Sequence, residues 1–87
     1  MADRSYQVLK HIKGIYEEIE FGSTTVSLND TFTLGNFSAT DNLNNVYIMK
    51  AADGTEMTNT HAANNVVSVT GAGTNIKCYY IAHGVKA

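Results

Sequence analysis

Three glutamates near the N-terminus are the residues whose types and spacing come closest to acid–base chemistry. Glu17, Glu18 and Glu20 could pair, as acid and base, with Asp41 or Asp53. A paired-carboxylate mechanism needs a cleft that holds the pKa values of the two groups apart, and a chain of 87 residues is barely large enough to form one. The better interpretation is a solvated strand face, whose glutamates would meet a basic patch on a partner in an assembly.

The histidines and the cysteine suggest a second kind of chemistry, metal binding or nucleophilic attack. The spacing of His11, His61 and His83 does not match a metal-binding motif, and no cysteine pair lies near them. The single cysteine, Cys78, lies in the middle of an apolar β pattern, where a thiol usually behaves as a small buried hydrophobic group. We therefore predict no metal, no cofactor and no catalytic residue, and we do not expect an enzyme.

A glycine-containing segment, residues 71–75, is superficially similar to a phosphate-binding loop. Such a loop opens a helix, whose N-terminus holds the anion. The residues that follow this segment alternate instead as in a β-strand. We interpret it as a hairpin loop.

The five tyrosines admit two interpretations. Stacked on an exposed face, they could hold sugars or bases. Tyrosine is also enriched at protein–protein interfaces, because its apolar ring and its polar hydroxyl both find partners there. Basic residues are not interleaved with these tyrosines, which argues against bases and favours an interface over a sugar site. The residues are Tyr6, Tyr16, Tyr47, Tyr79 and Tyr80.

The length of the chain limits how it can be stabilised. Eighty-seven residues make one domain, and a domain of this size buries only about 60–65% of the surface that its unfolded chain exposes. Small domains usually add disulfides, a metal or oligomerisation. The single cysteine excludes a disulfide within the chain, and a metal is not indicated. We therefore expect association with copies of the same chain or with a larger partner.

The charge and hydropathy patterns exclude several classes of partner. Charged residues make up 16% of the chain and the formal net charge is −2, so the clustered basic residues that bind nucleic acid are missing. No apolar run approaches the roughly 20 residues that cross a membrane, and the N-terminus lacks the apolar segment of a signal peptide. We predict synthesis in a cytoplasm without secretion, and neither a nucleic-acid nor a membrane partner; the resemblance given below implies that this is a host cytoplasm.

The first segment, residues 5–21, fits two kinds of secondary structure. Its apolar residues also lie at helical spacing, so a helix is the alternative. Read with period two, the segment splits at Gly14 into two strands. Glycine costs a helix interior about 1 kcal/mol relative to alanine and suits a turn, and together with the family resemblance described below this leads us to favour strands.

The period-two pattern also predicts which side chains of the second strand face the core. We expect the inward set to be Ile15, Glu17, Ile19 and Phe21. We expect the outward set to be Tyr16, Glu18 and Glu20.

A hairpin is predicted in the next part of the chain. Residues 24–28 and 31–34 are short, β-branched and alternating. Between them, Asn29 and Asp30 form a turn pair that tolerates positive φ.

The last quarter of the chain predicts a second hairpin, in which residues 66–70 and 75–82 are joined by the loop 71–74. Val67 and Val69 share one face of its first strand. In the second strand, Ile76, Cys78, Tyr80 and Ala82 lie on one face, and Lys77, Tyr79, Ile81 and His83 lie on the other. Large apolar side chains on both faces predict a central strand between two layers, or a strand with one face against another subunit.

The middle of the chain is less regular. Residues 35–45 read as a polar loop that Phe37 and Leu43 anchor to the core, and residues 46–50 read as a buried strand. Asp53 and Gly54 make a turn, and residues 55–65 read as a loop or an edge strand.

Several short strands separated by turn residues predict one all-β domain over residues 1–87, a small antiparallel β-sandwich or barrel. A helix in residues 5–21 would make the fold α+β. Residues 1–5 are a candidate flexible arm. Few lysines and no proline protect the sheet edges, so we expect an edge to pair with another chain.

Two parts of the sequence resemble the small β-sandwich virion proteins of tailed bacteriophages, especially the capsid decoration (cement) proteins. The first runs through residues 21–26 into 29–34, and the second runs from residue 66 to 76 and through 79–84. The resemblance implies a homotrimer on the capsid surface that holds the major capsid protein where capsomers meet, with no cofactor and no catalysis.

Function is therefore expected to lie in protein–protein contacts. The residues predicted to make them are Tyr16, Glu18, Glu20, Tyr79, Ile81 and His83. The first alternative is a phage tail or fibre module that binds a carbohydrate or receptor through its tyrosines. A small enzyme that uses Cys78 or a carboxylate is the second alternative.

Overall fold

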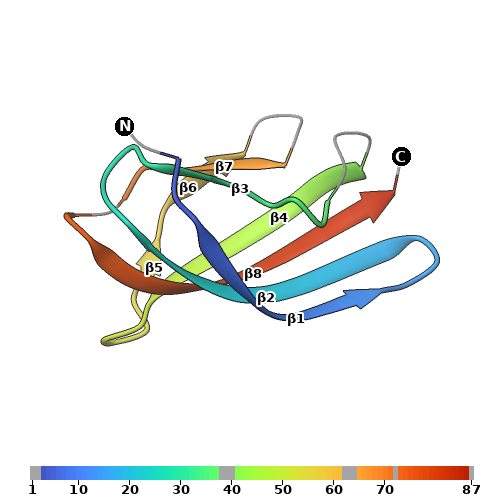
Figure 1. Cartoon of the computed structure of the whole chain (residues 1–87), viewed down its shortest axis with the longest axis horizontal. Helices are drawn as coiled ribbons and strands as arrows, with labels where there is room; N and C mark the ends of the chain where they lie inside the picture. The colour runs from blue at the N-terminus through green and yellow to red at the C-terminus, as the bar shows by residue number, and fades with distance from the viewer. Residues whose placement is uncertain (1–2, 38–40, 62–64, 72, 87) are drawn as a thin grey trace.

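The computed structural model describes residues 3–37, 41–61, 65–71 and 73–86 of the chain (Figure 1). These residues form strands, turns and loops, and no helix occurs among them. The strands are β1 (Tyr6–Lys13), β2 (Glu17–Val26), β3 (Thr31–Thr33), β4 (Asp41–Lys50), β5 (Glu56–Met57), β6 (Asn59–His61), β7 (Val66–Val69) and β8 (Ile76–Lys86).

The strands form two antiparallel sheets. The larger sheet has the order β1-β2-β8-β4-β5, and the smaller has the order β3-β7-β6. The smaller sheet lies over one face of the larger (Figure 1). The predicted all-β antiparallel sandwich is therefore confirmed.

The alternative helix in residues 5–21 is wrong. β1 and β2 form a hairpin there, and Gly14 lies in its turn, where its N–H donates to the carbonyl oxygen of Glu17 at 2.7 Å. β2 also pairs with β8 on its other side. Ladders on both sides satisfy the backbone groups of β2, which outweighs a helical spacing of apolar residues.

The core lies between the two sheets. Phe32 of β3 and Val67 of β7 face Ile48 of β4 and Tyr80 of β8, and all four side chains are at most 1% exposed. The rings of Phe32 and Tyr80 have their centroids 5.3 Å apart. Each large side chain buried in this way contributes about 1.5–3 kcal/mol to folding.

Both predicted later hairpins are wrong. β2 and β3 lie in different sheets, and so do β7 and β8. The predicted turn at Asn29 is confirmed by its φ of 67°, whereas Asn75, predicted as the first residue of a strand, lies before β8 with a φ of 48°. A turn reverses the chain, but it does not decide whether the next strand stays in the same sheet. Here β8 pairs with β2 over ten residues, whereas β7 has four residues and pairs with β3 and β6.

The predicted strand is central in its sheet, but a second layer covers only one of its faces within the described ranges, and contact of the other face with a subunit stays a prediction. β8 lies between β2 and β4, with Cys78, Tyr80 and Ala82 facing the core and Tyr79 and Ile81 on the other face. Opposite Tyr80 on β2 is Gly22. A Cβ there would lie 2.3 Å from the Tyr80 hydroxyl, so glycine leaves room for the ring.

The middle of the chain is partly as predicted. Phe37 and Leu43 are buried, but Leu43 lies in β4, which begins at Asp41 and so extends into the predicted loop. Gly54 has a φ of 75° in the predicted turn. Two short strands, β5 and β6, occupy part of residues 55–65, and residues 62–64 lie outside the described ranges.

The described part of the predicted N-terminal arm is anchored to the sandwich. The Arg4 N–H donates to the carbonyl oxygen of Thr31 at 2.7 Å, and Asp3 forms an isolated parallel bridge with Thr31. Residues 3–5 are therefore not a free arm, and residues 1–2 lie outside the described ranges.

Candidate functional site

The face of the larger sheet that points away from the smaller sheet carries a row of apolar side chains. Phe21 of β2, Ile81 of β8 and Tyr47 of β4 lie opposite one another in the strand registers. Together with their neighbours on the same face they form the outer apolar patch, whose members each expose 36–49% of their surface. Its members are Ile12, Ile19, Phe21, Tyr47, Tyr79 and Ile81.

Three of the predicted contact residues lie on this face. Tyr79 and Ile81 belong to the outer apolar patch, and His83 is beside it on β8 with a partly exposed side chain. The His83 Nε2 atom is 3.1 Å from Glu17 Oε1. Tyr16 is 75% exposed at the β1–β2 turn. A role of these residues in binding a partner stays a prediction.

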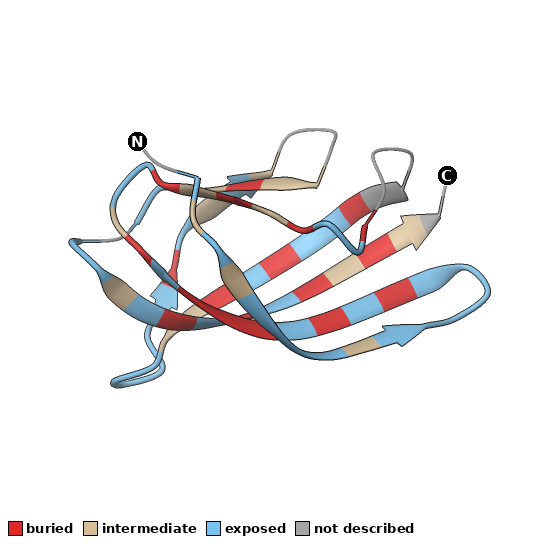
Figure 2. Cartoon of the chain, viewed as in Figure 1, coloured by how far each residue is buried: buried red, intermediate tan, exposed pale blue. Residues whose placement is uncertain are grey.

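The predicted orientation of β2 is wrong. Glu18 and Glu20 were expected outside, but they are 2% and 0% exposed, while Ile19 and Phe21 are each 36% exposed. The alternating stripes along β2 in Figure 2 follow this pattern. The reason is that the glutamates meet polar partners on the inner side of the sheet, whereas the apolar residues of β2 complete the outer apolar patch.

Glu20 is fully paired inside the protein. Its Oε2 accepts a hydrogen bond from the Tyr80 hydroxyl at 2.6 Å, and its Oε1 accepts one from the Asn36 Nδ2 group at 2.9 Å. The His11 Nδ1 atom is also 2.9 Å from Glu20 Oε1. Such bonds offset the cost of removing a carboxylate from water.

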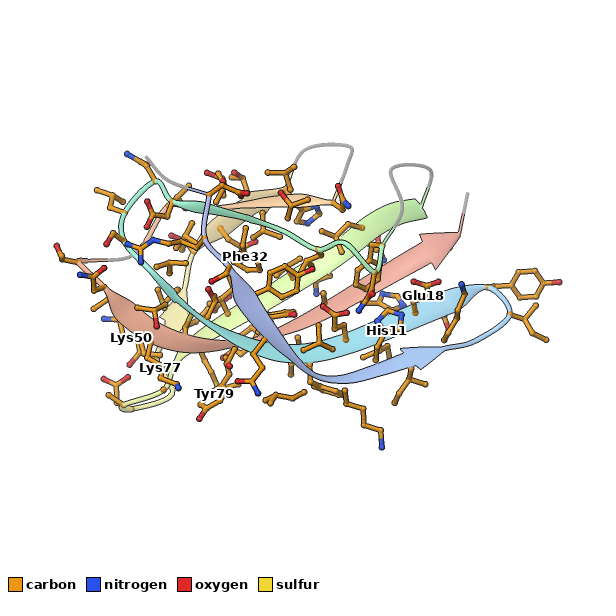
Figure 3. All side chains as sticks on the ribbon, in the orientation of Figure 1. His11, Glu18, Phe32, Lys50, Lys77 and Tyr79 are labelled. Carbon is orange, nitrogen blue, oxygen red and sulfur yellow. The ribbon has the colours of Figure 1, made fainter. Side chains whose placement is uncertain are left out.

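Glu18 is less well paired. Lys13 Nζ lies 3.6 Å from its Oε1, and His11 Nε2 lies 3.5 Å from its Oε2. The Oε2 atom is buried and accepts no hydrogen bond from the described residues. We call Glu18, Glu20, His11 and Tyr80 the buried polar cluster. In Figure 3, His11 and Glu18 lie close together toward the β1–β2 turn.

Two groups on β8 have shifted pKa values. Burial raises the pKa of the Tyr80 hydroxyl, and the hydrogen bond to Glu20 raises it further, so Tyr80 stays a donor. Burial also raises the pKa of Cys78, whose Sγ lies 3.6 Å from the carbonyl oxygen of Thr24. Cys78 is buried and behaves as the predicted small hydrophobic group.

A signal for the buried polar cluster was present in the sequence. Once a turn at Gly14 is accepted, the hairpin register places His11 opposite Glu20 and Lys13 opposite Glu18. Opposite charges at facing positions on one side of a hairpin indicate pairing. The face assignment failed because it considered β2 alone and placed its apolar residues inward.

Within the described ranges, the structure does not bring the other candidate metal-binding and catalytic residues of the sequence into one site. His11, His61 and His83 lie on β1, β6 and β8, and no group of three or more metal-binding side chains occurs within the described ranges. Two shallow grooves lie on the surface, one beside Ser5 and Lys77 and the other beside Asn45 and His61. Neither groove is lined by Glu18, Glu20 or Cys78.

No protein family, curated protein or solved structure matches this chain. In the described part of the chain, no helix is long and apolar enough to cross a membrane.

Proposed function

We propose that this chain is a structural protein of a virus particle, a non-enzymatic component that associates with copies of itself and binds a capsid surface. The single observation that carries the proposal is the outer apolar patch, because six large apolar residues on one sheet face are each 36–49% exposed. Contiguous apolar surface of this kind marks interaction sites in small soluble proteins. The finer assignment, a decoration protein bound across capsomers of a phage head, rests on the resemblance of two sequence segments to that family.

The contact uses a sheet face rather than a sheet edge. β1 is an edge strand with a bulge between Val8 and Lys10, and the edge strands β3, β5 and β6 have two or three residues each. Bulged and short edges are poor templates for strand pairing. The proposed contact therefore differs from the edge pairing expected from the sequence.

The experiment that tests this proposal measures mass and capsid binding for two variants. Ile81→Lys places a charge at the centre of the outer apolar patch, and we expect it to weaken association by roughly 100-fold or more. The matched control is Leu28→Lys, because Leu28 is 51% exposed but lies in the turn after β2, outside the patch. Analytical ultracentrifugation and cosedimentation with heads that lack the protein provide the readouts.

The outcomes separate clearly. The proposal is supported if Ile81→Lys weakens association and Leu28→Lys leaves it unchanged. A wild-type protein that is a monomer at all accessible concentrations and does not bind heads overturns it. Circular dichroism confirms that both variants keep the strand content of the wild type.

A second candidate is a carbohydrate- or receptor-binding module of a phage tail. It is favoured by Tyr47 and Tyr79, whose exposed rings share the outer face of the larger sheet. Aromatic faces bind sugars by stacking, and this function predicts specific binding on a glycan array that Tyr79→Ala removes. Absence of any glycan binding, with association intact, leaves the assembly function.

A further inference from the structure

We infer that His11 is held in its protonated form as a clip between Glu18 and Glu20, and that loss of this proton releases the end of β1 from the sandwich. The inference rests on the arrangement of the buried polar cluster. Its consequence for assembly, given below, rests in addition on the proposed function.

The two ring nitrogens of His11 each face a different carboxylate. Nδ1 is 2.9 Å from Glu20 Oε1, and Nε2 is 3.5 Å from Glu18 Oε2. A neutral imidazole has one N–H and an imidazolium has two. Only the imidazolium therefore directs an N–H at both carboxylates, and it brings a positive charge to two buried acids.

The shortage of hydrogen-bond donors around Glu18 supports a second proton on the His11 ring. Its Oε2 accepts no hydrogen bond from the described residues. The other cation nearby, Lys13, lies 3.6 Å from Oε1 and has a side chain that is 64% exposed, so its charge is largely solvated. Without a charged His11, the buried carboxylate of Glu18 would have one distant, screened partner.

The groups that face His11 come from every element around it. β2 contributes Glu18 and Glu20, and β8 contributes Tyr80, whose hydroxyl donates to Glu20. The turn after β3 contributes Asn36, which also donates to Glu20, and Phe37, whose ring is edge-on to the His11 ring at 5.4 Å. Tyr80 and Asn36 pair with Glu20 alone, so neither replaces His11 at Glu18.

His11 lies near the end of β1, so loss of its contacts with the glutamates would free that end of the strand. β1 is an edge strand that pairs only with β2 in the described sheet, and a bulge between Val8 and Lys10 divides it. The part beyond the bulge, residues 10–13, is held by its ladder with β2 and by the His11 clip. Because the clip needs the charged ring between two carboxylates, loss of the proton from His11 removes the clip and leaves residues 10–13 held by the ladder alone.

The experiment uses the isotopically labelled full chain at a concentration where it is monomeric. Nuclear magnetic resonance reports the protonation of each imidazole and the hydrogen exchange of each backbone amide from about pH 5 to pH 9, which spans the usual range of histidine titration. We expect both ring nitrogens of His11 to carry protons at the acidic end. As the ring titrates, we expect exchange at residues 10–13, corrected for its intrinsic pH dependence, to accelerate about 10-fold or more.

Two variants sharpen the test. His11→Gln keeps an amide donor but no charge, so exchange at residues 10–13 should be fast and independent of pH. The matched control, His61→Gln, changes a histidine of the smaller sheet and should behave as the wild type. If His11→Gln does not fold, the titration of the wild type decides alone. A His11 ring that is neutral throughout this range, or protection of residues 10–13 that ignores the charge of His11, overturns the inference.

The same titration bears on assembly. Ile12 lies in residues 10–13 and belongs to the outer apolar patch, so release of this segment should weaken association as the pH rises. Association that does not change while exchange follows His11 overturns this link. A chain that never associates overturns the proposed function, and the exchange of the monomer still decides the inference about His11.

Discussion

At the residue scale, the buried carboxylates are held by donors from separate parts of the chain. Glu20 is bonded by Tyr80 of β8 and by Asn36 of the turn after β3, and His11 of β1 lies against it. Of these residues, Tyr80 keeps its ring in the core and directs its hydroxyl at the acid, while Asn36 and His11 approach from more exposed positions. The cluster thus ties β1 and β8 of the larger sheet to β2.

The Tyr80→Phe variant tests this arrangement. It removes the hydroxyl that donates to Glu20 Oε2 at 2.6 Å and keeps the ring in the core. A buried charged acceptor that loses a donor costs about 1–3 kcal/mol, so we expect the free energy of unfolding in urea to fall by this amount. The control is Tyr47→Phe, an exposed tyrosine, with an expected change within about 0.5 kcal/mol. Equal effects of the two variants would contradict the role of the hydroxyl.

At the scale of elements, the crossings between the sheets are what distinguish this sandwich from a set of hairpins. The crossing from β2 to β3 is fastened by Asp30, whose Oδ2 accepts from Arg4 Nε at 2.7 Å and from the Ser27 N–H at 2.9 Å. Its carbonyl oxygen also accepts from the Val69 N–H at 2.9 Å. One residue therefore joins the N-terminus, the turn and β7.

The Asp30→Ala variant should loosen this crossing. Asp30 is 4% exposed, and its removal leaves the partly buried N–H donors of Arg4 and Ser27 without this acceptor, so we expect a loss of about 1–3 kcal/mol in the free energy of unfolding. The control is Asp3→Ala, because Asp3 is exposed and accepts one side-chain bond from Thr31 at 3.1 Å. Denaturant titration measures both, and a loss for Asp3→Ala as large as that for Asp30→Ala would show that the position of Asp30 has no special role.

At the scale of the whole molecule, the sandwich covers one face of its larger sheet and leaves the other open. The smaller sheet has three short strands, while β2, β4 and β8 have ten or eleven residues each. Figure 3 shows the labelled Phe32 between the sheets and Tyr79 on the opposite side of the larger sheet. Within the described ranges no further element covers that side, so its apolar residues stay partly exposed.

Association through this face should appear in thermal unfolding. A ligand that binds the folded state raises the midpoint temperature of unfolding with the logarithm of its free concentration, and a second copy of the chain acts as such a ligand. We expect the midpoint of the wild type to rise with protein concentration and that of Ile81→Lys to stay constant. Differential scanning calorimetry over a wide concentration range measures this, and a midpoint that does not depend on concentration in the wild type would count against self-association.

Much of the local structure could be predicted from particular residues. Gly14 marked the β1–β2 turn, Asn29 marked a position of positive φ, and the alternation of residues 76–82 predicted a central strand. Pairing partners could not be predicted, because an alternating strand presents the same pattern to a neighbour in either sheet. The inward burial of Glu18 and Glu20 depended on donors from β1, β8 and a distant turn, which are close only in the folded chain.

By itself, the amino-acid sequence determined an all-β domain, the positions of its main turns and the two-sided apolar character of β8, because these depend on local backbone preferences and on the period of two along a strand. The tertiary structure decided which strands pair and which face of β2 is inside. These choices depend on contacts between residues far apart in the chain, such as Tyr80 with Glu20 and His11 with both glutamates.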